Sequence, residues 1–441
     1  MTEPINTDVN GRNSLDRDFS LENNLDDTAS PKADETIRRN LWWLLPSIVP
    51  LVANQKGSGN VELDDIRYRV IRSGWECEKF YDFHVEYLAD SLGSRRGKVD
   101  FFVKVFGDNH DGTKTPPIEI EKKFYKIMQE SKVVPSLYDI PGLENCPGLE
   151  NVLLFGHGGR LSSEDKLVGL NDSDTRKVEE KILRNIARFN AWAYHQTSEA
   201  YGDDELRDWL KEKKPTAEKA VRYFREFLEA NDSEEDPGRI EQFGEKYQVF
   251  EDIYGQNGNQ LVHGDLRAQN VTGPEIGEWT EDNIKIVDLG DMAIASPLFP
   301  VAQFITSAGK KADIKRWNDE LHFYKCAEAN ALCGVTGGRG ISFAKDETKK
   351  SRARFYTSVV HTSLRGLSKM AKLRKRRPQD YERILTHRPV LESHDRDMYN
   401  NIRTAFTYLA RNAGELGLGR ANIGDLRCLT KELKKYEPLI A

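Results

Sequence analysis

The ten residues "LVHGDLRAQN", 261–270, place an acid and a carboxamide at a short, defined spacing. Two apolar residues lead directly into His263, Gly264 and Asp265, and Asn270 follows five residues after Asp265. An apolar pair that breaks into glycine and polar residues is typical of a short strand followed by a loop. The stretch therefore predicts that Asp265 and Asn270 are presented at the end of a strand.

A second predicted strand end supplies another acid. In "NIKIVDLGD", residues 283–291, isoleucine alternates with other residues before Asp288, which comes 18 residues after Asn270. We expect the two strand ends to converge, so that Asp265, Asn270 and Asp288 lie at one edge of a small sheet. Oxygen ligands from two elements suit Mg²⁺ when the phosphates of a nucleotide supply the remaining ligands. A further carboxylate can accept the proton of an attacking hydroxyl, so the pattern favours phosphoryl transfer.

Phosphoryl transfer also needs a cation on the phosphates, and "FFVKVF", residues 101–106, offers Lys104. Both faces of this predicted strand are apolar, so Lys104 should be at least partly buried and should need a partner. The helix expected over 117–130 has an apolar stripe. At about 100° per residue, Glu121 falls at the edge of the stripe and Glu119 on the opposite side. Glu121 is therefore the predicted partner of Lys104.

These residues resemble the motifs of the aminoglycoside phosphotransferase and choline kinase superfamily, whose members share the protein-kinase-like fold. The resemblance lies in "HGD" with Asn270, in "IVDLGD", in "VKV" around Lys104, and in "IEIEKKFYKIM" followed by "VVPSLYDI". "NVLLFGHGGRL", residues 151–161, stands where the family has its interlobe hinge. The resemblance spans roughly residues 65–306, and is faint in the first strands, where Gly74 is the possible phosphate-loop glycine.

The resemblance implies roles at the two loops. Asp265 would be the catalytic base, and Asn270 and Asp288 would hold Mg²⁺. His263 is interpreted as a structural loop residue, and Asp291 as an acid that acts indirectly, with direct metal contact as the alternative. In one departure, "SPLFPVAQF" has a proline where the family often has an acidic residue, which leaves open how the catalytic loop is braced.

The resemblance also implies a nucleotide site. Lys104 would contact the α- and β-phosphates and Glu121 would orient it. The backbone of Leu154, Phe155 and Gly156 would bind adenine. ATP is the expected nucleotide, with GTP as the alternative, and Mg²⁺ is the expected metal.

The length of 441 residues and the 38% hydrophobic content predict two or three structural units. Residues 1–37 are polar and acidic and are predicted to be disordered. Residues 38–158 are expected to form a small β-rich, nucleotide-binding N-lobe with one long helix. Residues 159–441 would form a larger helical C-lobe with the catalytic loop, the metal loop and the acceptor site. The predicted fold class is therefore α+β, a two-lobed protein-kinase-like fold.

Composition excludes other classes of protein. The net charge of −6 does not indicate a nucleic-acid or membrane partner, and the five scattered cysteines lack metal-ligand spacing. No run of 18 apolar residues and no secretory signal pattern is present, so a cytoplasmic protein without a transmembrane span is expected. The apolar segment 41–53 is interpreted as packed on the folded body. The alternative is an interfacial membrane anchor with Trp42 and Trp43 at the headgroups.

Two charged segments leave the acceptor open. Residues 369–377 contain six basic residues and no acid. They are interpreted as a solvated face, with an anionic substrate, a nucleic acid or an acidic membrane surface as alternatives. A basic cleft would repel a polycationic aminoglycoside, whereas the acidic residues 229–238 could attract a cation.

The predicted function is an ATP-dependent phosphotransferase that moves the γ-phosphate to a hydroxyl of a small molecule. One alternative is a nucleotide-binding pseudokinase or adaptor, and another is a kinase of a macromolecular substrate. The presence of all five expected site residues favours the enzyme.

Overall fold

The structure is a computed structural model, which divides into two compact units that we describe separately. It describes residues 44–53, 61–72, 79–89, 95–106, 118–139, 152–156, 161–162, 172–231, 240–241, 243–247, 260–273, 279–307, 312–336, 345–387, 393–416, 420–435 and 437. The predicted disordered tail over residues 1–37 lies outside the described residues, as do Trp42, Trp43 and Gly74.

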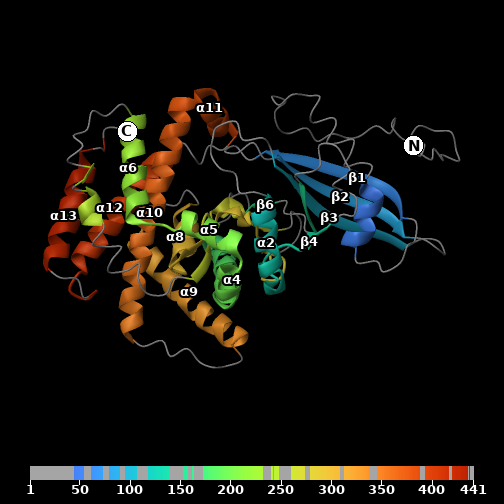
Figure 1. Cartoon of the computed structure of the whole chain (residues 1–441), viewed down its shortest axis with the longest axis horizontal. Coiled ribbons are helices and arrows are strands. Elements are labelled where there is room, and N and C mark those ends of the chain that lie inside the picture. The colour runs from blue at the N-terminus through green and yellow to red at the C-terminus, as the bar shows by residue number, and fades with distance from the viewer. Residues whose placement is uncertain are drawn as a thin grey trace. The chain divides into compact units, whose positions relative to one another are not determined.

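The first unit is built on an antiparallel sheet of order β1-β2-β3-β5-β4 (Figure 1). Its strands are β1 (Val61–Arg72), β2 (Lys79–Ala89), β3 (Arg95–Val105), β4 (Leu137–Tyr138) and β5 (Val152–Phe155). Alternate residues of β2 are buried, among them Phe83, whose ring stacks on that of Phe101 in β3 at 5.0 Å between centroids. This alternation is the one expected of a strand with one face on a core.

The apolar segment before the sheet forms a helix over residues 44–52. Leu45, Ile48 and Val49 of this helix are fully buried and belong to the same hydrophobic cluster as residues of β2 and β3. Their spacing places them on one helical face. The segment therefore packs on the sheet, as expected if it is part of the folded body and not an interfacial membrane anchor. Among the described residues, no helix is both long and apolar enough to cross a membrane.

The second unit is mainly helical (Figure 1). Its helices are α2 (Ile118–Met128), α4 (Asp172–Gly202), α5 (Asp204–Lys213), α6 (Ala217–Ala230), α8 (Leu298–Ser307), α9 (Ile314–Val335), α10 (Lys345–Arg376), α11 (Pro378–His387), α12 (His394–Arg411) and α13 (Arg420–Lys434). By contacts, α2 groups with this unit and not with the strands of the first. Helices together with an antiparallel sheet agree with the predicted α+β class, while the lobe boundaries stay a prediction.

Helix α4 supports the strand that leads into residues 264–270, which we call the catalytic loop after their predicted role. Ile182, Ile186 and Phe189 are fully buried at the spacing of one helical face. Thr197 Oγ1 accepts a hydrogen bond from the main-chain N–H of Leu261 at 3.0 Å. The position of the strand is therefore fixed by the helix against which it packs.

Four short strands and two 3₁₀ turns carry the loops. Strand β7 (Gln260–His263) pairs with β10 (Met292–Ala295), and β8 (Val271–Gly273) pairs with β9 (Lys285–Ile286), both antiparallel. The turn η4 (Ala268–Asn270) precedes β8, and η5 (Leu289–Asp291) precedes β10. These pairings bring the segment 264–270 next to the segment 287–291.

Candidate active site

His263 fixes the start of the catalytic loop. Its side chain is fully buried, and its Nδ1 accepts the main-chain N–H of Asp265 at 3.1 Å. Since Nδ1 is an acceptor, the proton of the neutral ring is on Nε2, which donates to the carbonyl of Val287 at 2.9 Å. Burial lowers the pKa of His263, so the ring stays neutral. These contacts give His263 a structural role, because it ties the loop to the strand before Asp288.

Asp265, Asn270 and Asp288 are brought together by main-chain contacts. Asn270 Nδ2 donates to the carbonyl of Asp265 at 2.8 Å, and the carbonyl of Asn270 accepts the N–H of Val287 at 3.0 Å. Val287 directly precedes Asp288. The two predicted strand ends therefore converge, and the amide oxygen of Asn270 is left outside these bonds.

Asp288 stands in an uncommon backbone conformation, with φ 66° and ψ 60°. Left-handed backbone is more accessible to aspartate than to most residues and is frequent at functional sites. The main-chain N–H of Asp288 donates to the hydroxyl of Tyr125 at 3.0 Å. Helix α2, on which Tyr125 lies, therefore holds the backbone of the predicted metal loop.

Gly264 is required by the close approach of the two loops. A Cβ built at this position would overlap the carbonyl oxygen of Asp291. Any other residue would push the turn η5 away from the catalytic loop. The glycine of "HGD" is therefore explained by packing.

Helix α8 braces the catalytic loop in place of an acid. Gln303 is buried, and its side chain bonds on both sides of Asp265. Its Oε1 accepts the N–H of Leu266 at 2.9 Å, and its Nε2 donates to the carbonyl of Gly264 at 2.8 Å. Ser307, at the end of the same helix, accepts the N–H of Ala268 at 2.9 Å. A neutral amide therefore does the bracing in "SPLFPVAQF".

The carboxylate of Asp265 is buried among cations. Arg267 Nε donates to Asp265 Oδ1 at 3.0 Å, and Arg365 Nη1 lies 3.5 Å from the same oxygen. Burial raises the pKa of Asp265, but Arg267, Arg365 and Lys369 together lower it below its usual value. Asp265 Oδ2 accepts no hydrogen bond from any residue that the structure describes. This oxygen is the one available to a ligand.

Asp291 links the loop to two helices. Its Oδ1 accepts from Lys213 Nζ of α5 at 2.9 Å, and its Oδ2 accepts from Arg365 Nη2 of α10 at 3.1 Å. Burial raises the pKa of Asp291, and Arg365, Lys213 and Lys369 lower it by more. Both carboxylate oxygens are thus engaged by cations, which supports the indirect role and not metal contact.

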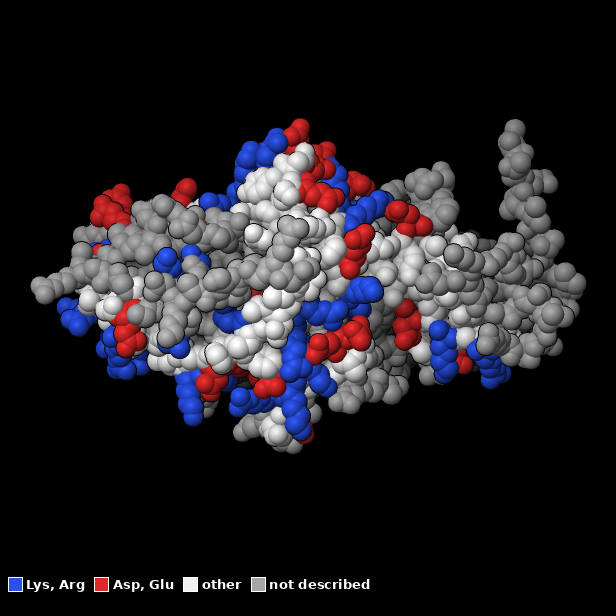
Figure 2. Space-filling view, turned by 90° about the horizontal axis from the view of Figure 1, so that it is seen from below, with Lys and Arg blue, Asp and Glu red and all other residues white. Residues whose placement is uncertain are grey.

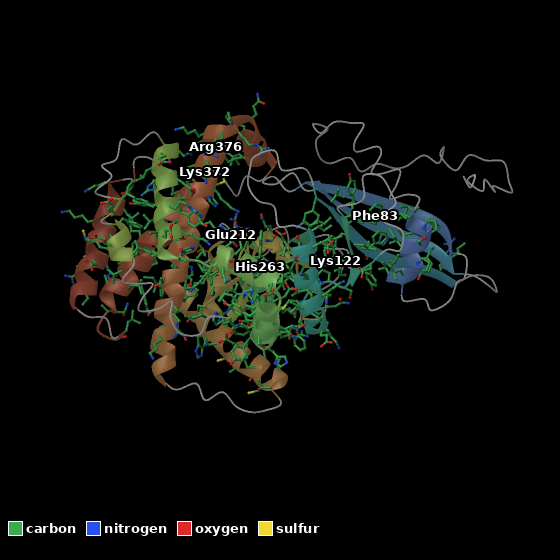
Figure 3. All side chains as sticks on the ribbon, viewed as in Figure 1. Phe83, Lys122, Glu212, His263, Lys372 and Arg376 are labelled. Carbon is green, nitrogen blue, oxygen red and sulfur yellow. The ribbon has the colours of Figure 1, made fainter. Side chains whose placement is uncertain are left out.

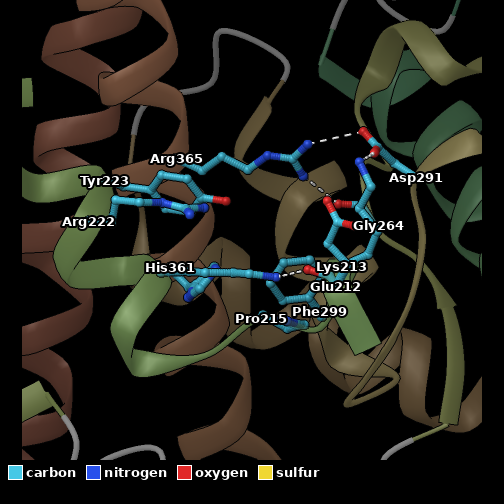
Figure 4. Close-up of a pocket in the computed structure, with 11 residues that line it drawn as sticks. Glu212, Lys213, Pro215, Arg222, Tyr223, Gly264, Asp291, Phe299, His361 and Arg365 are labelled. Atoms are coloured by element: carbon cyan, nitrogen blue, oxygen red, sulfur yellow. Dashed lines mark hydrogen bonds and ion pairs between the residues drawn. The ribbon is translucent and has the colours of Figure 1, made fainter. Parts of the chain in front are cut away.

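Arg365 was missed by the sequence analysis. Besides the pair with Asp291, its Nη1 donates to the carbonyl of Gly264 at 2.7 Å (Figure 4). Arg365 stands 101 residues after Gly264, so no local motif includes it. The signal in the sequence is the spacing of His361, Arg365 and Lys369, which stand at i, i+4 and i+8 on one face of a helix.

A cavity of about 200 Å³ adjoins the catalytic loop within the second unit (Figure 4). Helices α5, α6, α8 and α10 and the two loops contribute its walls. The lining residues are Glu212, Lys213, Pro215, Lys219, Arg222, Tyr223, Gly264, Asp291, Phe299, His361 and Arg365. Gly264, which directly precedes Asp265, lines the cavity, so the cavity lies next to the predicted catalytic residue.

The residues predicted to bind nucleotide include four in the first unit. Lys104 is 1% exposed on β3, and its Nζ lies 4.8 Å from the centroid of the Phe106 ring. The side chains of Leu154 and Phe155 are buried in β5, and Gly156 follows the strand. Burial of these side chains leaves the backbone as the part of the segment that can meet a base.

Glu121 is fully buried on α2, whereas Glu119 is exposed. This difference confirms the orientation that the helical periodicity predicts. Glu121 lies one turn before Tyr125, on the buried face of α2. The pairing of Glu121 with Lys104, which belongs to the other unit, stays a prediction.

The basic run 369–377 lies at the end of α10, where Lys372 is visible in Figure 3. Lys372 pairs with Glu226 at 3.0 Å, and Arg374 pairs with Asp395 at 3.2 Å. These two charges are therefore balanced within the second unit. On the face shown in Figure 2, basic and acidic side chains are interspersed over the described residues.

Comparison with models of protein families gives no match, and comparison with curated proteins gives none. Comparison with solved structures gives matches that include choline kinases and an aminoglycoside phosphotransferase. A choline kinase from Cryptosporidium parvum is 12% identical, with 74% of this chain and 91% of that chain covered and a TM-score of 0.40.

A choline kinase from Streptococcus pneumoniae is 11% identical, with 86% of this chain and 99% of that chain covered and a TM-score of 0.42. An ADP-bound aminoglycoside phosphotransferase is 13% identical, with 76% and 99% covered and a TM-score of 0.36.

Proposed function

We propose that the protein is an ATP-dependent phosphotransferase that transfers the γ-phosphate to a hydroxyl of a small molecule. The observation that carries the proposal is the convergence of Asp265, Asn270 and Asp288. They lie on two loops joined by the contacts of His263 and Asn270. The carboxylate of Asp265, with one oxygen available to a ligand, therefore lies beside Asn270 and Asp288, whose side-chain oxygens could bind a metal ion.

The donor set fits Mg²⁺. Asn270 would offer its amide oxygen, since its nitrogen is bonded to the carbonyl of Asp265, and Asp288 would offer its carboxylate. Two protein oxygens suit an ion that takes most of its ligands from phosphates and water. When bound, the ion would neutralise charge on the phosphates. The hydrogen bond that the main-chain N–H of Asp288 donates to the hydroxyl of Tyr125 holds the backbone of one of the two metal-binding residues in place.

Asp265 would orient the acceptor hydroxyl through Oδ2 and receive its proton late in the transfer. Its lowered pKa makes it a weak base. Phosphoryl transfer through a loose transition state needs positioning of the nucleophile more than early deprotonation. The bonds of Gln303 to both neighbours of Asp265 supply that positioning.

The nucleotide would be bound from the residues predicted for it. Lys104 would contact the α- and β-phosphates, with Glu121 as its orienting partner. The backbone of Leu154, Phe155 and Gly156 would hydrogen bond the base. The burial of Lys104 on β3 supports this role, because an ammonium group that is shielded from water interacts more strongly with a phosphate.

The test is Asp265→Asn. Turnover should fall by about 100- to 10,000-fold, the usual contribution of a positioned acid or base. Binding of ATP should be retained, since Asp265 makes no contact with the nucleotide in this proposal. Magnesium-dependent ADP release over a panel of alcohols, sugars and amino alcohols measures turnover, and calorimetry measures ATP binding.

Asp208→Asn is the matched control, because Asp208 lies on the surface of α5 with its side chain 73% exposed. Unchanged turnover in Asp265→Asn would contradict the proposed role. A wild-type chain that binds ATP but releases no ADP with any acceptor would favour the adaptor. GTP in place of ATP in the same assay would identify the nucleotide.

A further inference from the structure

The cavity beside the catalytic loop is lined by more positive than negative charge. Four of its lining residues are basic and two are acidic. We call it the basic pocket, after Lys213, Lys219, Arg222 and Arg365. The four come from α5, α6 and α10, so three separate helices direct cations at one space.

The acids of the pocket do not balance these cations. Asp291 is shared between Lys213 and Arg365, each of which takes one of its oxygens. Arg365 also lies 3.5 Å from Asp265. The carboxylates of Asp291 and Asp265 are thus engaged by Lys213 and Arg365, which are two of the four cations.

Lys219 lacks such a partner. Its Nζ donates to the carbonyls of Glu212 and Lys214, and no carboxylate among the described residues lies within ion-pair distance of it. Burial lowers the pKa of Lys219 to about 8, with further contributions from Arg222, Lys213 and Arg365. A half-buried ammonium group beside other cations is destabilised unless an anion enters.

Of the remaining walls, Glu212 adds a carboxylate, which raises the pKa of Lys219 against the contributions above, and His361 adds no charge. His361 is buried, and burial together with Arg365 and Lys219 lowers its pKa to about 3, so the ring is neutral near pH 7. The rings of Tyr223 and Phe299 each meet that of His361 edge-on, at 5.7 Å between centroids. A cationic acceptor would therefore face four positive side chains against two carboxylates, those of Asp291 and Glu212.

We propose that the acceptor of the transferred phosphate carries an oxyanion besides its hydroxyl, and that the basic pocket binds this carboxylate or phosphate group. The proposal rests on the proposed function. Lys219 and Arg222 would bind the oxyanion, and the pocket wall at Gly264 would direct the hydroxyl to Asp265 Oδ2. Arg365 reaches both the pocket and Asp265, so it marks the passage between them.

Four probes of matched size test the charge of the acceptor: glycerol, glycerate, glycerol 3-phosphate and 3-aminopropane-1,2-diol. Binding is measured by calorimetry with excess AMP-PNP and Mg²⁺, so that the nucleotide's phosphate site is filled. Glycerate or glycerol 3-phosphate should bind at least tenfold more tightly than glycerol, and the amine should bind more weakly than glycerol. The carboxylate and phosphate arms identify the preferred oxyanion.

Two variants locate the binding. Arg222→Gln and Lys219→Met should each weaken oxyanion binding about tenfold, the effect of losing one charged contact of about 1.4 kcal/mol. Arg225→Gln is the matched control, because Arg225 is an exposed arginine of the same helix that does not line the cavity. Arg222 is 56% exposed at its side chain and lies 3.9 Å from the carboxylate of Glu226 one turn later, a surface pair whose loss should leave the fold intact.

The outcomes separate the two proposals. Binding of the amine as tight as that of the oxyanions, or oxyanion binding equal in the wild type and both variants, overturns the pocket assignment and leaves the phosphotransferase standing. Oxyanion binding that is lost in Arg222→Gln, but without phosphate transfer to any probe or panel compound, supports the pocket and contradicts the proposed function.

Discussion

The two sides of the candidate site are held by different forces. On the loop side, His263, Asn270 and Gln303 fix Asp265 through hydrogen bonds between neutral groups. On the helical side, Lys213 and Arg365 are held by charge on Asp291. The neutral bonds fix geometry as long as the His263 ring is unprotonated, whereas an excess of cations creates a demand for an anion. The loop side is therefore where we propose the chemistry, and the helical side is where we propose that the acceptor is chosen.

Arg365 joins the two sides, so its loss should have the largest effect. Arg365→Met would leave Asp265 and Asp291 buried with fewer cations, and the free energy of unfolding should fall by about 3–5 kcal/mol. Urea denaturation followed by circular dichroism measures it.

Arg376→Gln is the control, because Arg376 is an exposed arginine of the same helix. A loss below about 1 kcal/mol in Arg365→Met would show that the two sides are independent. A double-mutant cycle with Asp291→Asn would then measure what coupling remains.

Gln303 tests the loop side alone. Gln303→Leu would leave the N–H of Leu266 without its acceptor, at a cost of about 1–3 kcal/mol, and turnover should fall because Asp265 loses its positioning. The KM for ATP should stay unchanged.

Thr306→Val in the same helix is the matched control, since Thr306 bonds only within α8, to the carbonyl of Ala302. Turnover that fell as much in Thr306→Val as in Gln303→Leu would point to the helix as a whole and not to the brace.

His361 gives the smallest effect, and one that depends on pH. Its pKa of about 3 in the folded chain is lowered from 6.5, so between these values the unfolded chain binds more protons. Stability from this group is complete above pH 6.5 and is lost as the pH falls toward 3. His361→Gln removes the titration, so the loss of stability from pH 7 to pH 5 should be smaller in the variant by about 2 kcal/mol.

Urea denaturation at the two pH values measures this difference. An equal loss in the wild type and in His361→Gln would show that His361 is protonated without penalty. The cations packed around it, Lys219 and Arg365, would then be less influential than the basic pocket requires.

The same contrast explains what could be predicted from the sequence. Asp265, Asn270 and Asp288 stand at strand ends next to apolar runs, and the choice of Glu121 over Glu119 follows from helical period. Such signals are local. Gln303 and Arg365 reach their partners through packing of segments that are distant in the sequence, so neighbouring residues carry no sign of their role. A lone glutamine in the apolar helix α8 was a usable signal, since a buried amide must be bonded.

Helix α2 carries two residues of the candidate site, Tyr125 and Glu121. The hydroxyl of Tyr125 accepts the amide of Asp288, and Glu121 lies one turn earlier on the same helix. A rotation of α2 that withdrew Glu121 would also break the support of the left-handed residue at 288. The predicted partner of Lys104 and the backbone of the predicted metal loop thus depend on one helix, so a displacement of α2 would affect both.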